Sequence, residues 1–298
     1  MLGPVPADPY TIHPSGRFSL AAAARFIAAW PPAQGVTVAD DGSVRLSFVL
    51  DSFAGHGGAR VVEGDGGVLR VEPAGEASED ELRRQVARIL SLDHDGAGLA
   101  EVIDRDPVVA AISRGADGLR PVLFHSPYEA AAWSVISART QQQRAQRVRA
   151  ELSRELGVVL EVGGVAMPAF PLPQRLAELD AFPGLTEEKV TRLRGLAAAA
   201  LEGRLDPERL RAAEPATALL ELQQIRGIGP FYAGLILVRS AGVTDVLPPG
   251  VEPRLRAAVG DAYGLGGPAS AADFERITDG WRPFRTWIAV LMRSAAGG

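Results

Sequence analysis

The chain has 298 residues, a length that accommodates about two domains, and its formal net charge is −5. With 47% hydrophobic and 22% charged residues it has the composition of a globular protein, which excludes a disordered chain. Cys is absent, which excludes disulfides, thiolate zinc sites, iron–sulfur clusters and a cysteine nucleophile.

No uninterrupted apolar run approaches the roughly 20 residues that a membrane-spanning helix needs. The best candidate, residues 20–30, is interrupted by Arg25. The first ten residues, MLGPVPADPY, lack the basic segment followed by an apolar one that marks a signal peptide. We therefore expect a cytoplasmic protein with no membrane partner.

The basic residues are almost all of one kind. Lys189 is the single Lys among the 31 basic residues, so the other 30 are Arg. Arg binds phosphates in a bidentate way, which fits a nucleic-acid partner. Codon bias in a chain rich in Ala, Gly, Val and Pro accounts for the same excess, and we regard it as the simpler explanation.

The first 77 residues carry most of the strand signals. Residues 18–30 have apolar side chains at helical spacing, and residues 43–50 alternate as a strand does. Residues 59–73 form two short apolar runs around the sequence GDGG, which is typical of a β-hairpin. This pattern predicts a small antiparallel α+β domain over residues 1–77.

From residue 78 onward the sequence is typical of short helices joined by short turns. Capping residues mark the helix starts, either as Ser followed by Glu three residues later, as Asp before Pro, or as Thr. They are Ser78, Asp106, Ser126, Thr186 and Asp206. The longest stretch without helical signals, residues 157–173, is interpreted as a loop that crosses the helical surface.

The most informative segment is residues 219–240, LLELQQIRGIGPFYAGLILVRS. One helix is expected to end near Ile225, a tight turn to follow over 226–229, and Pro230 to open a second helix. In this helix-hairpin-helix pattern the free amides at the start of the second helix point at an anion such as a DNA phosphate. A structural turn between packed helices is the alternative.

Five blocks of sequence occur in the order found in one family: residues 86–112, 119–145, 184–206, 222–248 and 281–293. They resemble the helix-hairpin-helix DNA glycosylase superfamily, and within it the alkylbase (3-methyladenine) DNA glycosylases of the second type. The resemblance implies a mainly α, two-lobed fold that follows the N-terminal domain. One lobe is formed by residues 78–118 together with 245–298, and the other by residues 119–244.

The resemblance also implies an activity. Such enzymes flip a damaged nucleotide out of double-stranded DNA and hydrolyse its N-glycosidic bond, as the first step of base excision repair. A carboxylate after the hairpin stabilises the positive charge that develops on the sugar. The implied partner is DNA that contains damaged bases, bound by a monomer associated with the nucleoid, and no cofactor is required.

The catalytic position departs from the family pattern. Counted without gaps from the hairpin, the family's Asp falls on Val251, and Glu252 follows one residue later. Three interpretations remain open. Glu252 is the catalytic carboxylate, the chain is a catalytically silent DNA-binding protein or damage sensor, or Glu252 only caps the next helix and another carboxylate acts. Asp245 is expected to brace the loop.

The resemblance assigns the base pocket to three aromatic residues, Tyr128, Trp133 and Phe231. Phe231 stands where the lyase branch of the superfamily has its Lys, so a lyase step through an amine is not expected. A role of Phe231 in the core is an equal alternative to stacking on a base. Arg293 stands where some relatives carry an aromatic residue, so a pocket that differs from theirs is expected.

Contacts to DNA are expected from the wedge loop and from the hairpin. Arg139, Thr140 and Gln141 occupy the loop that fills the gap left by a flipped base, or else they decorate a solvent-exposed turn. The expected hairpin contacts are Arg226, Gly227, Ile228, Gly229 and Tyr232. Arg144, Arg147 and Arg154 fall near one helical face, which is either a DNA-binding face or a solvated surface.

Relatives can hold a monovalent cation at the hairpin on backbone carbonyls. The matching carbonyls here are those of Gln223, Ile225 and Gly227, and this assignment comes from the resemblance alone. The run Asp93-His94-Asp95 is not expected to bind a metal, because three adjacent side chains on a turn rarely converge on one ion.

Overall fold

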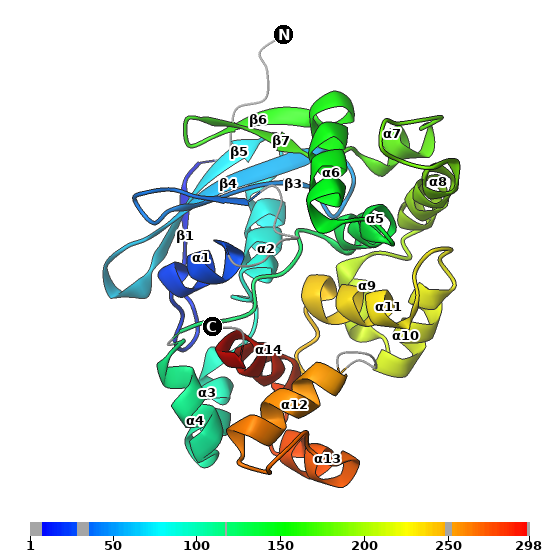
Figure 1. Cartoon of the computed structure of the whole chain (residues 1–298). Coiled ribbons are helices and arrows are strands. Elements are labelled where there is room, and N and C mark those ends of the chain that lie inside the picture. The colour runs from blue at the N-terminus through cyan, green and yellow to red at the C-terminus, as the bar shows by residue number, and fades with distance from the viewer. Residues whose placement is uncertain (1–7, 29–35, 117, 248–251, 297–298) are drawn as a thin grey trace.

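The computed structural model describes residues 8–28, 36–116, 118–247 and 252–296. An antiparallel sheet with two helices lies at one end of the molecule, with helices α5 to α11 beside it and α12 and α13 at the far end (Figure 1). The expected fold class, mainly α with a small antiparallel N-terminal domain, is confirmed.

The N-terminal sheet has five antiparallel strands in the order β1-β5-β4-β3-β2. Their bounds are Tyr10–Ile12 (β1), Val36–Val38 (β2), Val44–Val49 (β3), His56–Glu63 (β4) and Leu69–Gly75 (β5). The predicted hairpin is β4–β5, and it turns at Gly66 and Gly67, which both have positive φ. Helix α1 (Leu20–Ala28) and helix α2 (Glu79–Ile89) pack into the core of this domain.

Residues 157–173 are not a loop, contrary to the prediction. They form a hairpin of β6 (Val158–Val162) and β7 (Val165–Ala169), which turns at Gly163 and Gly164 with φ of 54° and 74°. The hairpin packs on the five-stranded sheet, where Ser47 Oγ donates a hydrogen bond to the Pro168 carbonyl. A Gly-Gly pair between two apolar runs is a hairpin signal, so this hairpin could have been predicted from the sequence.

The remaining elements are helices, and all the predicted caps form. Ser78, Asp106, Ser126, Thr186 and Asp206 each accept a hydrogen bond from an amide in the first turn of the helix they precede. The helices not yet named are α3 (Gly96–Arg105), α4 (Pro107–Arg114), α5 (Pro127–Ser137), α6 (Gln142–Leu156), α7 (Pro173–Ala177), α8 (Glu187–Leu201), α9 (Pro207–Ala212), α10 (Pro215–Gln223), α11 (Pro230–Ile236), the π-helical turn η2 (Leu237–Ala241), α12 (Glu252–Ala262), α13 (Ala271–Asp279) and α14 (Arg285–Ala296).

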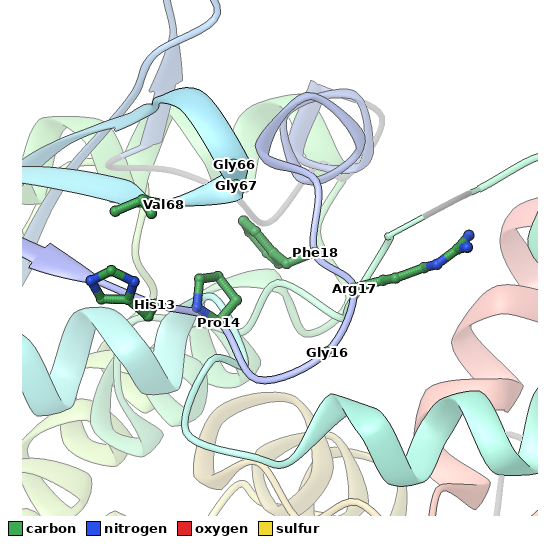
Figure 2. Close-up of a pocket in the computed structure, with 8 residues that line it drawn as sticks. All are labelled: His13, Pro14, Gly16, Arg17, Phe18, Gly66, Gly67 and Val68. Atoms are coloured by element: carbon green, nitrogen blue, oxygen red, sulfur yellow. The ribbon is translucent and has the colours of Figure 1, made fainter.

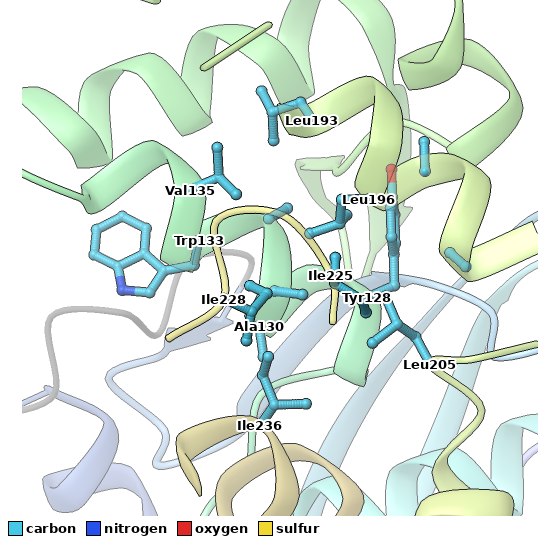
Figure 3. Close-up of a cluster of buried hydrophobic side chains, with 14 of the residues drawn as sticks. Tyr128, Ala130, Trp133, Val135, Leu193, Leu196, Leu205, Ile225, Ile228 and Ile236 are labelled. Carbon is cyan, nitrogen blue, oxygen red and sulfur yellow. The ribbon is translucent and has the colours of Figure 1, made fainter. Parts of the chain in front are cut away.

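The buried side chains of the helices form two large clusters. One joins α5 and α6 to α8, α10, α11 and η2, and Figure 3 shows part of it. The other joins α3 and α4 to α12, α13 and α14, which are distant in the sequence. Among the described residues, no helix has both the length and the apolar character needed to cross a membrane.

Arginines are buried where the sheet domain meets the helices. Arg120 is fully buried, and its guanidinium donates hydrogen bonds to the carbonyls of Arg17, Ser91, His94 and Ser15. One side chain thus ties the chain before α1 to the connection between α2 and α3.

A second buried network surrounds Glu129. This carboxylate accepts hydrogen bonds from the Val49 amide at 3.1 Å and from Arg149, and it lies 3.5 Å from His125 Nδ1. Burial alone would raise the pKa of Glu129, but His125, Arg149 and the amide outweigh burial and lower it. The ionised carboxylate therefore joins β3, α5 and α6.

Candidate functional site

The predicted helix-hairpin-helix forms between α10 and α11. Gly227 has φ of 101°, and a Cβ at this position would lie 3.0 Å from Arg192 Cδ, so the turn needs glycine here. Pro230 is the first residue of α11, and the residue before it, Gly229, provides no side-chain cap. The amides of the first turn of α11 are therefore left without a side-chain acceptor, as the anion-binding hypothesis requires.

The turn lies at the surface, although one of its residues anchors it. Arg226 and Gly229 are exposed, whereas Ile228 is buried beside Ala130 and Ile236 (Figure 3). The Ile228 amide donates to the Ile225 carbonyl at 3.0 Å. The side chain and the amide of Ile228 are thus both used within the protein, and its expected contact with DNA stays a prediction.

The wedge loop, defined here as residues 137–141, is fastened to the hairpin and to α8. The hydroxyls of Ser137 and Tyr232 are 3.1 Å apart. Lys189 Nζ donates to Thr140 Oγ1 at 2.6 Å and to the Ile136 carbonyl at 2.7 Å. Tyr232 and Thr140, both expected to contact DNA, thus use their hydroxyls to join this loop to neighbouring helices.

Arg139 is the exposed residue at the centre of the wedge loop. Its φ is 51°, a left-handed conformation that costs a residue with a Cβ roughly 1–2 kcal/mol. Such backbone strain is typical of functional loops whose surroundings hold them in place. Gln141 is also exposed and precedes α6 without capping it.

Several cationic side chains lie near the wedge loop. Arg144, Arg147 and Arg154 are exposed on α6, whereas Val148 and Leu152 of the same helix are buried. Partial burial lowers the pKa of the Lys189 ammonium, and the positive charges of Arg144 and Arg192 lower it further. Helices α6 and α8 thus bring Arg144, Lys189 and Arg192 near one another in an acidic protein.

The three aromatic residues expected in the base pocket differ in their exposure. Phe231 is 47% exposed and contacts Tyr232 edge-to-face. Tyr128 is fully buried, and its hydroxyl donates to the Pro171 carbonyl at 3.0 Å. In this structure the ring of Tyr128 thus belongs to the core, and its expected place in a base pocket stays a prediction. Trp133 is also buried, in the same cluster.

The catalytic position is described only in part. Val251 lies outside the described residues, and Glu252 is the first residue of α12, although its side chain is not described. Asp245 braces this region, as predicted. Its carboxylate accepts hydrogen bonds at 2.7 Å from Arg282 and from Arg285.

Three arginines lie close together around the beginning of α12. Burial and the positive charge of Arg293 lower the pKa of Arg239 to about 9, and Arg239 donates to the Val122 carbonyl at 2.7 Å. Burial and the charge of Arg254, in the first turn of α12, lower the pKa of Arg293. Arg293 thus lies near enough to both Arg239 and Arg254 for their charges to interact.

One of the three backbone carbonyls expected to hold a cation already accepts a hydrogen bond. The Ile225 carbonyl already accepts the Ile228 amide, which leaves its second lone pair, together with the Gln223 and Gly227 carbonyls, for an ion. Asp93 pairs with Arg211 and lies 3.8 Å from His94 Nε2, His94 also contacts the Gly242 carbonyl, and Asp95 accepts the Ala97 amide. No group of three His, Cys, Asp or Glu within the described ranges is arranged to hold a metal.

Two hollows found among the described residues lie away from this surface. The first, of about 230 Å³, is in the N-terminal domain (Figure 2), and it is lined by His13, Pro14, Gly16, Arg17, Phe18, Gly66, Gly67 and Val68. The second, of about 520 Å³, is lined by Arg105, Asp106, Asp279, Gly280 and Arg282. Neither contains a residue of the hairpin or the wedge loop.

Among known proteins, the chain is similar in sequence and in structure to DNA glycosylases. No family model matches the chain. The chain is 26% identical over 180 residues to a DNA-3-methyladenine glycosylase of Bacillus subtilis, a match that covers 59% of each protein.

The solved structures that are similar cover nearly the whole chain. A 3-methyladenine DNA glycosylase from Archaeoglobus fulgidus superposes with a TM-score of 0.75 at 21% identity, over 95% of this chain and 96% of that one. An 8-oxoguanine glycosylase/lyase of Clostridium acetobutylicum bound to double-stranded DNA gives 0.69 at 17% identity, over 98% and 97%. The resemblance seen in the sequence is thereby confirmed, and the chain has the fold of the helix-hairpin-helix DNA glycosylases.

Proposed function

We propose that this protein is a monofunctional DNA glycosylase that hydrolyses the N-glycosidic bond of damaged, in particular alkylated, bases in double-stranded DNA. The observation that carries the proposal is that the Ser137 and Tyr232 hydroxyls join the start of the wedge loop to the helix after the hairpin, with the cations Arg144, Lys189 and Arg192 nearby. The similarity to DNA-3-methyladenine glycosylases supports the same activity.

The hairpin would hold the DNA backbone. The uncapped first turn of α11 offers amides to one phosphate, and the exposed Arg226 adds a positive charge beside it. These contacts fix the position of the duplex without reading its sequence. Arg139 then fills the space left by the flipped nucleotide, and the exposed face of Phe231 stacks on the everted base.

Glu252 would supply the carboxylate of the reaction. As the C1′–N bond breaks, the electron pair leaves with the base and positive charge develops on the deoxyribose. A carboxylate at the start of α12 stabilises this charge and orients the water that attacks C1′, while the water's proton passes to the carboxylate or to solvent. Val251 cannot do this, because its side chain is apolar.

A lyase step has no evident nucleophile. Phe231 occupies the position of the lysine that such a step uses, and the only Lys of the chain has its Nζ engaged by the Ile136 carbonyl and Thr140. The expected product is therefore an intact abasic strand.

The decisive experiment measures base release from methylated duplex DNA under single-turnover conditions, with the wild type and with Glu252→Gln. We expect release by the wild type and a loss of about 10²-fold or more in the variant, with DNA affinity retained. Damaged-DNA binding without release by the wild type would support the alternative, a catalytically silent damage sensor. The substrates should include both 3-methyladenine and 7-methylguanine, which are alkylated bases of the kind that the proposal names.

A further inference from the structure

The single lysine of the chain occupies one specific place, behind the wedge loop. Lys189 lies in the first turn of α8, where Thr186 caps the helix by accepting the Lys189 amide at 3.3 Å. From there its ammonium reaches the last turn of α5 and the loop that follows it. Two of the three ammonium hydrogens are used, one on the Ile136 carbonyl and one on the Thr140 hydroxyl.

These two contacts act on opposite sides of Arg139 in the sequence. The Ile136 carbonyl belongs to the end of α5, where the last carbonyls of a helix lack partners in the helix itself. Thr140 follows Arg139 directly, and its amide donates to the Ser137 carbonyl at 3.1 Å. Because Lys189 binds both flanks, it closes the loop into a short arch with Arg139 at its exposed top.

The chemistry of the contact explains why a lysine stands here in a chain that otherwise uses arginine. A compact ammonium carries three donors along tetrahedral directions, so it can donate to two separate acceptors at once. The planar guanidinium fork suits flat, paired acceptors such as carboxylates and phosphates. Lys189 holds its position although Arg144 and Arg192 are near enough to lower its pKa.

We propose that Lys189 is the positioning residue of the wedge loop: by bonding the Ile136 carbonyl and the Thr140 hydroxyl it holds Arg139 in the left-handed, exposed conformation that enters the duplex. This inference rests on the proposed function. Lys189 touches neither the base nor the sugar in this role, and it acts through Arg139.

The test compares Lys189→Met, which keeps the length of the side chain but removes its donors, with Thr140→Val, which removes the acceptor hydroxyl. The control is Arg175→Met, which removes one positive charge from an exposed side chain on α7. Eversion is followed in stopped flow by the fluorescence of 2-aminopurine placed next to the lesion. Thermal unfolding verifies that each variant is folded.

We expect eversion to be about tenfold slower in Lys189→Met and in Thr140→Val, with no further loss when the two are combined, as expected for one shared hydrogen bond to a charged group. Arg175→Met should evert at the wild-type rate. In an Arg139→Ala background, Lys189→Met should have no additional effect. The proposal is overturned if Lys189→Met slows eversion equally with and without Arg139, or if Arg175→Met produces the same loss.

A second measurement does not depend on DNA. Hydrogen exchange of the peptide that spans residues 138–143 should be at least tenfold faster in Lys189→Met than in the wild type, because the arch opens. If the wild type everts no base from any lesion, the proposed function fails, while this exchange still reports on the loop. Unchanged exchange would show that Lys189 does not hold the loop, whatever the activity.

Discussion

The arginine side chains of two regions of this molecule differ in burial and in the groups that they bind. At the junction between the sheet domain and the helices, Arg88, Arg120 and Arg149 are buried and bind backbone carbonyls or a buried carboxylate. Around the hairpin and the wedge loop, Arg139 and Arg144 are exposed. The first group joins segments of the protein, and the second is available to phosphates.

The comparison teaches that the excess of arginine in this sequence has no single explanation. Buried guanidiniums offer five donors in a plane, which lets Arg120 bind four carbonyls from two segments at once. Exposed guanidiniums instead contribute positive charge that can attract the phosphates of DNA. Mutations at the junction should therefore change stability, whereas mutations on the hairpin surface should change DNA binding.

The largest effect is expected at the junction. Glu129→Ala leaves Arg149 buried without its carboxylate, and removing one partner of a buried pair costs about 3–5 kcal/mol of unfolding free energy. Denaturant unfolding measures this loss. The control is Glu178→Ala, whose exposed pair with Arg175 should contribute under about 1 kcal/mol. Equal losses in the two variants would remove the distinction between the regions.

On the hairpin surface we expect a change in affinity alone. Arg144→Ala combined with Arg147→Ala should weaken the binding of undamaged duplex about tenfold at moderate salt, and lower the slope of log affinity against log salt by up to about 2. Fluorescence anisotropy over a salt series measures both. The unfolding free energy should stay within about 0.5 kcal/mol of the wild type. A large drop in stability would mean that these arginines belong with the buried group.

The junction should also respond to pH. Burial lowers the pKa of His94, which the attraction of Asp93 opposes and the charge of Arg211 assists. Since the folded protein then binds fewer protons than the unfolded chain, stability should fall as the pH drops below about 6.5. The slope attributable to His94 cannot exceed about 1.4 kcal/mol per pH unit. Unfolding of His94→Gln between pH 7 and pH 5 should show a shallower slope, and an unchanged slope would contradict the assignment.

The smallest effect is expected at the top of the wedge loop. Arg139→Gly removes the strain of the positive φ, so it should be more stable than Arg139→Ala by about 1 kcal/mol. Both variants should lose eversion, because both lack the wedge side chain. A glycine variant that is less stable than the alanine variant would show that the loop is not strained in the native state.

Much of the fold could be predicted because local signals agree with the structure. The caps at Ser78, Ser126 and Thr186 and the hairpin glycines act over a few residues, so the sequence alone reveals them. The β6–β7 hairpin was missed, although its Gly-Gly turn was visible, because its strands gain their stability from packing on a distant sheet.

The candidate site was less predictable than the fold. Tyr128 and Ile228 stand in motifs to which the resemblance assigned base and DNA contacts, and only the packing around them shows that they are buried. The roles of Lys189 and Tyr232 depend on contacts across 49 and 95 residues of sequence, which no spacing rule reveals. The chemistry at Glu252 remains a prediction from the resemblance.

The β6–β7 hairpin has a consequence for how the molecule holds together. It is covalently part of the segment between α6 and α7, yet it lies against β3, β4 and β5 like an additional layer of the N-terminal sheet. Removing residues 1–77 would uncover apolar side chains such as Val162 and Met167, which pack in one cluster with Ala74 of β5. We therefore expect the protein to melt in a single cooperative step, and the helical part expressed by itself to aggregate.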